Sequence, residues 1–221
     1  MARASDILAV ARKQIGVTEM PAGSNNVRYN TWYYGREVRG SGYPWCMVFV
    51  QWCADQAGVK LPRRTASCGD LMRSAQAAGQ WVTDDYCPGD IAIFDFPGGG
   101  TTDHCGIIES VDGGAVFTIE GNTSVGNDSN GGEVMGRTRS ANLIRGAVRP
   151  VYEAEEEIEM RYNTVSECPK WSQETIRKLI RKGCLSGNGK KDAQGMPTDL
   201  DLSHDMVRLL VIHDKAKLFD K

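Results

Sequence analysis

The sequence has no long hydrophobic run and no excess of one charge. No apolar stretch approaches 18 residues, so the sequence predicts no helix that spans a membrane. The formal net charge is −2, which indicates neither a nucleic-acid partner nor attachment to a membrane surface. The first residues lead directly into a helical pattern and lack the apolar core of a signal peptide, which predicts synthesis in the cytoplasm.

Histidine is scarce, and the cysteines form none of the familiar paired motifs. There are three histidines and seven cysteines, with no CxxC pair and no Cys/His group at the spacing of a zinc site. We therefore predict no metal and no cofactor. Apart from Cys46, we expect the cysteines to be buried, reduced thiols that pack as small hydrophobic side chains.

The composition is that of a globular chain, with 41% hydrophobic and 24% charged residues. A length of 221 residues allows one full domain and a smaller second one. The acidic run near residue 155 resembles a solvated linker. We predict a first, larger domain at 1–152, a linker at 153–160 and a small helical module at 161–221.

The hydrophobic pattern changes from helical to strand-like along the first domain. Helical periodicity predicts helices over 5–14, 46–57 and 67–78, while the Gly/Asn/Tyr-rich stretch up to Tyr43 is interpreted as an ordered loop. Helices followed by an antiparallel sheet indicate an α+β fold. Strands are predicted at 91–96, 104–111, 115–120 and 143–148, and two further helices at 172–182 and 203–217.

Cys46 lies where the second, nearly all-apolar helix is predicted to begin. Unpaired backbone N–H groups and the helix dipole favour a thiolate at such a position and lower the pKa of the thiol. The same N–H groups can stabilise the oxyanion that forms when a thiolate attacks an amide carbon. A cysteine at a helix start is more often a packing residue, however, so a nucleophile there needs a nearby base.

His104 is the one histidine of the first domain. His204 and His213 lie in the C-terminal module, where a surface or capping role is expected. If Cys46 has a histidine partner in its own domain, that partner is His104. A third polar group is then expected to hold the imidazole in the correct tautomer.

Hairpin register predicts which groups lie beside His104. The Asp-Gly-Gly turn at 112–114 indicates a tight hairpin between two strands. Pairing of Val111 with Gly114 places His104 opposite Gly121, and a one-step change places it opposite Thr123. In both registers Glu120 and Asn122 lie beside His104 and, at i and i+2, share one face of their strand. Their alternative role is that of a strand end that emerges into solvent.

Three segments resemble the CHAP family of cysteine, histidine-dependent amidohydrolases and peptidases. The resemblance covers roughly residues 5–150, with the motifs in the same order and spacing. It implies a papain-like fold, with N-terminal helices packed on a small antiparallel sheet. It also implies peptidoglycan as the substrate, cut as an N-acetylmuramoyl-L-alanine amidase or as a peptide endopeptidase. The matching segments are YPWCMVFVQWC from Tyr43, DHCGII from Asp103 and IEGNT from Ile119.

The resemblance also assigns roles to individual residues. It implies that Cys46 is the nucleophile, His104 the base, Glu120 the group that orients the histidine, and Asn122 an auxiliary polar group. Some members of the family bind calcium through closely spaced aspartates, but residues 23–42 contain none, so we predict no calcium site here. Aromatic side chains suit sugar rings and are candidates for substrate binding, although core packing explains some of them equally well. They are Trp32, Tyr33, Tyr34, Tyr43 and Trp45.

The C-terminal module resembles the small helical modules appended to many lysins and amidases of Gram-positive bacteria and their phages. That resemblance implies attachment to a secondary wall polymer. The alternative is a stabilising or oligomerising appendage, because about 60 residues form a marginal core that can require a partner surface, including that of a second copy.

Three functional hypotheses follow. The first is a phage or prophage endolysin, or a bacterial autolysin, which is made in the cytoplasm and acts on the cell wall after a separate factor releases it. The second is a non-catalytic cell-wall-binding protein on a papain-like scaffold. The third is an amidase of a small intracellular peptide conjugate.

Overall fold

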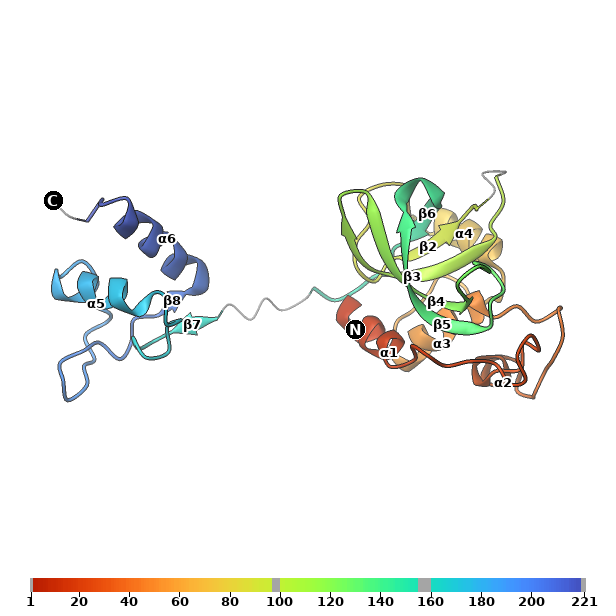
Figure 1. The fold of residues 1–221 in the computed structure, drawn as a ribbon, viewed down its shortest axis with the longest axis horizontal. Helices are drawn as coiled ribbons and strands as arrows, with labels where there is room; N and C mark the ends of the chain where they lie inside the picture. The colour runs from red at the N-terminus through yellow and green to blue at the C-terminus, as the bar shows by residue number, and fades with distance from the viewer. Residues whose placement is uncertain (1, 97–99, 155–159, 220–221) are drawn as a thin grey trace. The chain divides into compact units, whose positions relative to one another are not determined.

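The computed structural model describes residues 2–96, 100–154 and 160–219, which form two compact units divided between residues 155 and 156 (Figure 1). Residues 155–159 of the predicted linker lie outside the described residues. Within the described ranges, no helix is long and apolar enough to cross a membrane.

A six-stranded antiparallel sheet forms the centre of the first unit, with the strand order β1-β6-β2-β3-β4-β5. Alternate residues of the central strands face two separate apolar clusters, as expected for a sheet that is covered on both faces. Ile93, Ile107 and Ile119 face the helices, and Phe94 and Ile108 face the other cluster. The strands are β1 (Trp81–Val82), β2 (Ile91–Phe94), β3 (His104–Asp112), β4 (Ala115–Thr123), β5 (Glu133–Ser140) and β6 (Ile144–Val148).

Four helices accompany the sheet, and the central one is almost completely buried. This is α3, which contacts β3 and β4, while α1 and α2 pack on α3 and α4 contacts β1 and β6. Eight of the eleven residues of α3 are buried, which explains its nearly uniform hydrophobicity. The helices are α1 (Ala4–Arg12), α2 (Arg28–Tyr34), α3 (Cys46–Gln56) and α4 (Cys68–Ala77), and a short 3₁₀ helix, η1 (Ala141–Leu143), precedes β6.

The helices predicted over 5–14, 46–57 and 67–78 are confirmed, and the predicted α+β class is correct. The expected loop before Cys46 is wrong, because it contains α2. Asn30 stabilises this helix from inside the protein by donating from Nδ2 to the carbonyls of Asn25 and Tyr43, at 2.8 and 3.0 Å. Gly35 ends the helix in the left-handed conformation, with φ +69°.

Two strands of this sheet were not predicted, and both lie at its edges. In β5, which spans Glu133–Ser140, Val134 and Arg139 are the buried residues, so no apolar alternation identifies it. The other is the two-residue strand β1. The four predicted strands are present as β2, β3, β4 and β6.

The second unit is small and mainly helical. Its core contains Tyr162, Ile176, Leu202 and Val207. The predicted helices at 172–182 and 203–217 correspond to α5 and α6. The elements are β7 (Arg161–Tyr162), α5 (Gln173–Arg181), β8 (Leu202–Ser203) and α6 (His204–Lys215).

The prediction that the cysteines are buried needs a correction. All seven are free thiols, but Cys87 and Cys184 are exposed. Cys87 lies in the turn before β2, and Cys184 follows the end of α5, so neither occupies a core-facing position of a helix or strand. The other five thiols are buried.

Candidate active site

Cys46 is the first residue of α3 and keeps 6% of its surface exposed. The helix begins here because the carbonyl of Trp45 accepts the first intrahelical bond, from the amide of Phe49 at 2.9 Å. The amides of the first turn have no acceptor within the helix, so they surround the thiol with positive partial charge. Cys46 therefore occupies the position that the sequence predicts for a stabilised thiolate.

His104 begins β3 and is completely buried. Its Nε2 lies 3.1 Å from Oε2 of Glu120, so the ring donates from Nε2 to this carboxylate. The imidazole packs against two phenylalanine rings that also stack on each other, with centroid distances of 6.0 Å to Phe94 and 5.8 Å to Phe96. The other nitrogen, Nδ1, is buried and has no hydrogen-bond partner among the described residues. A ring with Nε2–H on the carboxylate leaves Nδ1 available to exchange a proton with a thiol or a substrate.

Cys46 and His104 each shift the titration of the other. Hydrogen bonds from the neighbouring thiols of Cys105 and Cys68, together with His104, lower the pKa of Cys46 well below its usual range. Burial alone would lower the pKa of His104, but the contacts with Cys46 and Glu120 outweigh it and raise that pKa to about 9. The two directions agree with a thiolate–imidazolium pair at neutral pH.

Glu120 is a buried carboxylate with every oxygen engaged. Oε1 accepts from the Thr118 hydroxyl at 2.6 Å and from Nε of Arg139 at 2.9 Å, while Oε2 accepts from Nη2 of Arg139 at 2.6 Å as well as from His104. Burial would raise the pKa of Glu120, but Arg139 and His104 outweigh it and lower that pKa to about 2. The carboxylate is therefore charged whenever His104 can be protonated.

Gly106 provides the space for this carboxylate. A Cβ atom on Gly106 would lie 2.6 Å from Cγ of Glu120, so a side chain here would displace the group that holds His104. A glycine normally weakens a strand, but at position 106 it is required because it leaves room for the Glu120 carboxylate.

Arg139 is a site residue that the sequence did not reveal. It extends from β5, forms two hydrogen bonds with Glu120 and a third, at 2.7 Å, with Asp128. Its guanidinium also lies over the rings of Phe96 and Phe94, at 4.9 and 5.6 Å. A bidentate arginine fixes a carboxylate in both position and charge. An arginine on an unrecognised edge strand, 19 residues after Glu120, carries no local signal in the sequence.

The one-step-changed register is correct next to the turn, but a bulge interrupts it before it reaches His104. Val111 pairs with Val116 and Asp112 with Ala115, and the register shifts between Ile108 and Ser110. The bulge absorbs one residue of β3, which sequence arithmetic cannot anticipate. Glu120 still reaches His104, because the shifted register continues as far as the pairing of Ile107 with Ile119.

The described residues show no hydrogen bond from Asn122 to His104 or Glu120, so its auxiliary role stays a prediction. Its φ is +60°, and the pairing of β4 with β5 shifts between Glu120 and Thr123, so the alternation of faces ends there. Within the described residues, its amide bonds Oδ1 of Asn130 at 3.1 Å and the backbone N–H of Gly132 at 3.2 Å. Asn122 thus holds the loop before β5 in place.

The aromatic candidates separate into two groups. Trp45 is completely buried and packs on Tyr29 with centroids 5.5 Å apart, so the substrate-binding role predicted for it is wrong. The others are partly exposed and form a continuous series of ring contacts of 4.9–6.2 Å. Arg64 covers the end of the series, 4.7 Å from the ring of Trp32. The series is Trp32, Tyr33, Tyr34 and Tyr43.

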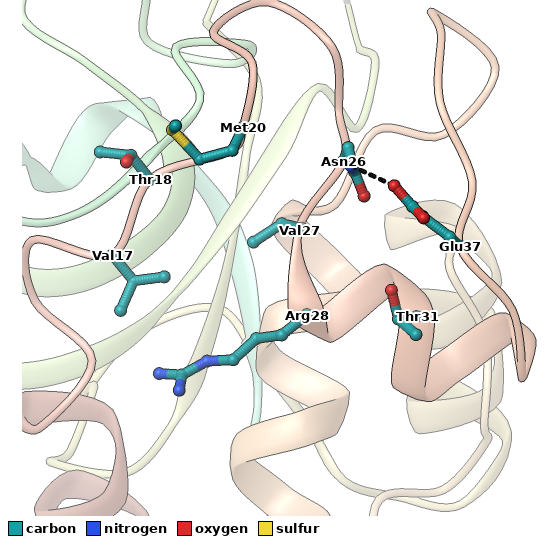
Figure 2. A pocket seen from close by; sticks show the side chains of 8 residues that line it. All are labelled: Val17, Thr18, Met20, Asn26, Val27, Arg28, Thr31 and Glu37. Atoms are coloured by element: carbon teal, nitrogen blue, oxygen red, sulfur yellow. Dashed lines mark hydrogen bonds between the residues drawn. The ribbon is translucent and has the colours of Figure 1, made fainter.

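A separate pocket of about 400 Å³ lies between the segment after α1 and the start of α2. Figure 2 shows Asn26 bonded to Glu37 across one side of it, at 2.6 Å, with Arg28 extending along the other. None of its lining residues belongs to the Cys46–His104–Glu120 group. We assign it no part in the chemistry.

Titration of Cys46 provides the first prediction. Because the pKa of Cys46 is lowered, its alkylation rate should change by no more than about threefold between pH 6 and 8. An ordinary thiol, with a pKa near 8.5, gains thiolate by a factor of about 80 over the same range. Iodoacetamide labelling, followed by mass spectrometry of the Cys46 peptide, measures this, with a short unstructured cysteine peptide as the reference.

The control variant is His104→Ala, which removes the imidazolium and should steepen the Cys46 profile towards that of the reference peptide. A wild-type profile as steep as the reference would contradict the ion pair. Peptide-level analysis is needed because Cys87 and Cys184 are exposed and will also be alkylated.

Comparison with known proteins matches part of this sequence to one protein family. Residues 38–122 match the CHAP domain, and this segment contains Cys46, His104, Glu120 and Asn122. No curated protein matches the sequence. Two similar solved structures are the crystal structure of Ly7917 and that of Ly7917 with the hydrolyzing product of MDP. Each is 18% identical, with TM-scores of 0.41 and 0.40.

The aligned region covers 66% of this chain and 62% of each Ly7917 chain, so this chain spans less than two thirds of their length. The family match rests on the sequence and includes the residues that the structure brings together, namely the thiol at the start of α3 and the histidine and carboxylate of β3 and β4. The chain therefore contains a CHAP domain.

Proposed function

We propose that this chain is a peptidoglycan hydrolase that cleaves an amide bond, with Cys46 as the nucleophile and His104 as the acid and base. The observation that supports it most is the buried relay in which Arg139 holds Glu120 and Glu120 holds His104, whose pKa Cys46 raises. The substrate class comes from the CHAP domain match. Glu120 and Arg139 act as positioning residues in this proposal.

The first half of the reaction forms a thioester. The Cys46 thiolate attacks the amide carbon, and the carbonyl electrons move to oxygen, where N–H groups of the first turn of α3 stabilise the charge. The C–N bond then breaks as the His104 imidazolium donates its proton to the leaving nitrogen. The free amine departs, and the acyl group remains on sulfur.

The second half restores the enzyme. His104, now neutral, accepts a proton from water, and the resulting hydroxide attacks the thioester carbon. The C–S bond breaks, which releases a carboxylic acid and regenerates the thiolate–imidazolium pair. Glu120 keeps the imidazole in one orientation throughout and stabilises its charged form.

The products released from purified sacculi test the proposal. Cleavage of an amide bond should release new amino groups and soluble peptides or glycan strands, with no increase in reducing sugar ends. Amino-group and reducing-end assays measure both, and mass spectrometry of the digest identifies the bond and separates an amidase from an endopeptidase.

New reducing ends without new amino groups would overturn the amide-bond assignment. Sacculi that stay intact while the protein pellets with them would support the non-catalytic wall-binding alternative. Activity on soluble amides but not on sacculi would indicate a small conjugate as the substrate.

We further propose an endolysin or autolysin role, in which the second unit attaches the enzyme to a wall polymer. Trp171 is 54% exposed and meets the ring of His204 edge-on at 6.1 Å, at a hollow that Arg208 and Lys215 also line. An exposed aromatic ring beside two cations suits an anionic polymer with sugar rings. Trp171→Ala should reduce co-sedimentation of the full chain with walls, and unchanged sedimentation would contradict this role.

A further inference from the structure

Cys46 is one of three buried thiols that meet in space although they are far apart in the sequence. The Sγ atoms of Cys46, Cys68 and Cys105 all lie within 4.8 Å of one another. In the described part of the chain, this is the one group of three or more histidine, cysteine or acidic side chains that could hold a metal ion. Sequence spacing does not indicate it, because no two of these residues belong to a CxxC motif.

Each thiol is held by a different element. Cys46 begins α3, Cys68 begins α4, and Cys105 lies on β3 next to His104. Ser67 fixes the start of α4 by accepting the amide of Asp70 at 3.2 Å. Two helix N-termini therefore meet at the cluster, and their dipoles favour negative charge on the sulfur atoms. The position of the thiols is set by packed secondary structure, which gives a preformed site.

A second observation points to a ligand at this place. Nδ1 of His104 is buried and forms no hydrogen bond among the described residues, although Cys46 lies near enough to raise the His104 pKa, while Nε2 is bonded to Glu120. A metal-binding histidine usually donates its other ring nitrogen to a carboxylate in this way, which fixes the tautomer and strengthens the ligand. The ring stands outside the group of three sulfur atoms, so it would have to move towards an ion that they hold.

We infer that Cys46, Cys68 and Cys105 form a site for a thiophilic divalent cation such as Zn²⁺, with His104 placed to complete the coordination. Three thiolates and one imidazole are an established tetrahedral ligand set for zinc. In a tetrahedral site, Zn–S bonds of about 2.3 Å place the sulfur atoms about 3.8 Å apart. The three Sγ atoms lie within 4.8 Å of one another, so each pair has to approach by no more than about 1 Å.

Binding would occupy the groups that the proposed reaction uses. The ion takes the Cys46 thiolate and displaces the protons of Cys68 and Cys105 as their Zn–S bonds form, and a third proton leaves Nδ1 of the His104 imidazolium when that nitrogen coordinates. Cys46 and Cys68 are the two residues of the cluster that are not completely buried, with 6% and 7% of their surface exposed. The metal site stands on the geometry alone. Its consequence, reversible inhibition of hydrolysis, rests on the proposed function.

Cobalt(II) is the probe for this site. The full chain, reduced and freed of metal, should bind one Co²⁺ with the intense thiolate charge-transfer and visible bands of a tetrahedral site, and Zn²⁺ should displace it. Cys68→Ala and Cys105→Ala should each weaken binding by at least about tenfold, the smallest effect typical of even outer-shell partners of a metal. Cys53→Ala, which removes a buried thiol of α3 outside the group, should leave binding unchanged.

Two outcomes would overturn the inference: no tetrahedral spectrum from the folded, reduced chain, or full affinity in Cys68→Ala. Cys68 lies nearer the surface than Cys105, so its replacement is less disruptive. If the Cys105 variant does not fold, the affinity of the Cys68→Ala variant for Co²⁺ decides the test. Zn²⁺ should also stop hydrolysis of sacculi until a chelator is added. Co²⁺ binding by a chain that does not hydrolyse sacculi would contradict the proposed function but not the metal site. Hydrolysis by a chain that does not bind Co²⁺ would contradict the metal site but not the proposed function.

Discussion

Arg139→Leu is expected to destabilise the protein by about 3–5 kcal/mol, because it leaves the buried Glu120 charge without its main partner. Both residues are nearly inaccessible to water, at 6% and 0% side-chain exposure, so solvent cannot replace the lost bonds. Glu120 would then take up a proton more readily and release His104. Urea unfolding measures the stability loss, and the pH profile of any remaining activity should narrow as the His104 pKa falls.

Arg137→Leu is the matched control. Arg137 lies two residues earlier on the same strand and also pairs with Asp128, at 2.6 Å, but the carboxylate it meets is 47% exposed. An exposed pair of this kind contributes at most about 1 kcal/mol. Equal stability losses in the two variants would show that Arg139 acts only as a surface ion pair.

A double variant separates charge balance from packing. Glu120→Gln combined with Arg139→Met removes both charges and should recover much of the stability lost in Arg139→Leu, because a buried pair can be replaced by neutral groups at little cost. Activity should stay low, since the imidazolium has then lost its carboxylate. Recovery of activity together with stability would show that the Glu120 carboxylate is not needed to position His104.

The sequence predicts the parts of this fold that depend on local periodicity. The start of α3 at Cys46 follows from an apolar run after Pro44, and the start of α4 follows from the capping serine, Ser67. The strands at the centre of the sheet alternate or are continuously apolar, so they are recognised as well. Because Cys46 and His104 lie at the starts of such elements, sequence alone identifies both as candidates.

The remaining parts depend on contacts between distant residues. The helix α2 is stabilised by Asn30 reaching backbone carbonyls, and β5 is an edge strand whose buried Arg139 breaks the apolar pattern. The bulge near Ser110 alters the register that locates Glu120, and the left-handed conformation of Asn122 ends the alternation of faces after Glu120. The cluster of three thiols joins residues up to 59 positions apart. No local pattern encodes these relationships.

Cys46→Ala is expected to reduce hydrolysis of sacculi by about 10³-fold or more, because the thiol that carries the acyl group in the proposed reaction is then missing and only binding and oxyanion stabilisation remain. The change removes one sulfur atom from a position that is 6% exposed, so the fold should be retained. Cys53→Ala removes another buried thiol from the same helix and should keep most of the activity.

The release of amino groups from purified sacculi by wild-type protein, Cys46→Ala and Cys53→Ala, with matched circular dichroism spectra, tests the central assignment most directly. The account predicts full release by the wild type, near-complete retention in Cys53→Ala and release at background level in a folded Cys46→Ala. Release by the folded Cys46→Ala at a rate near that of the wild type would contradict it.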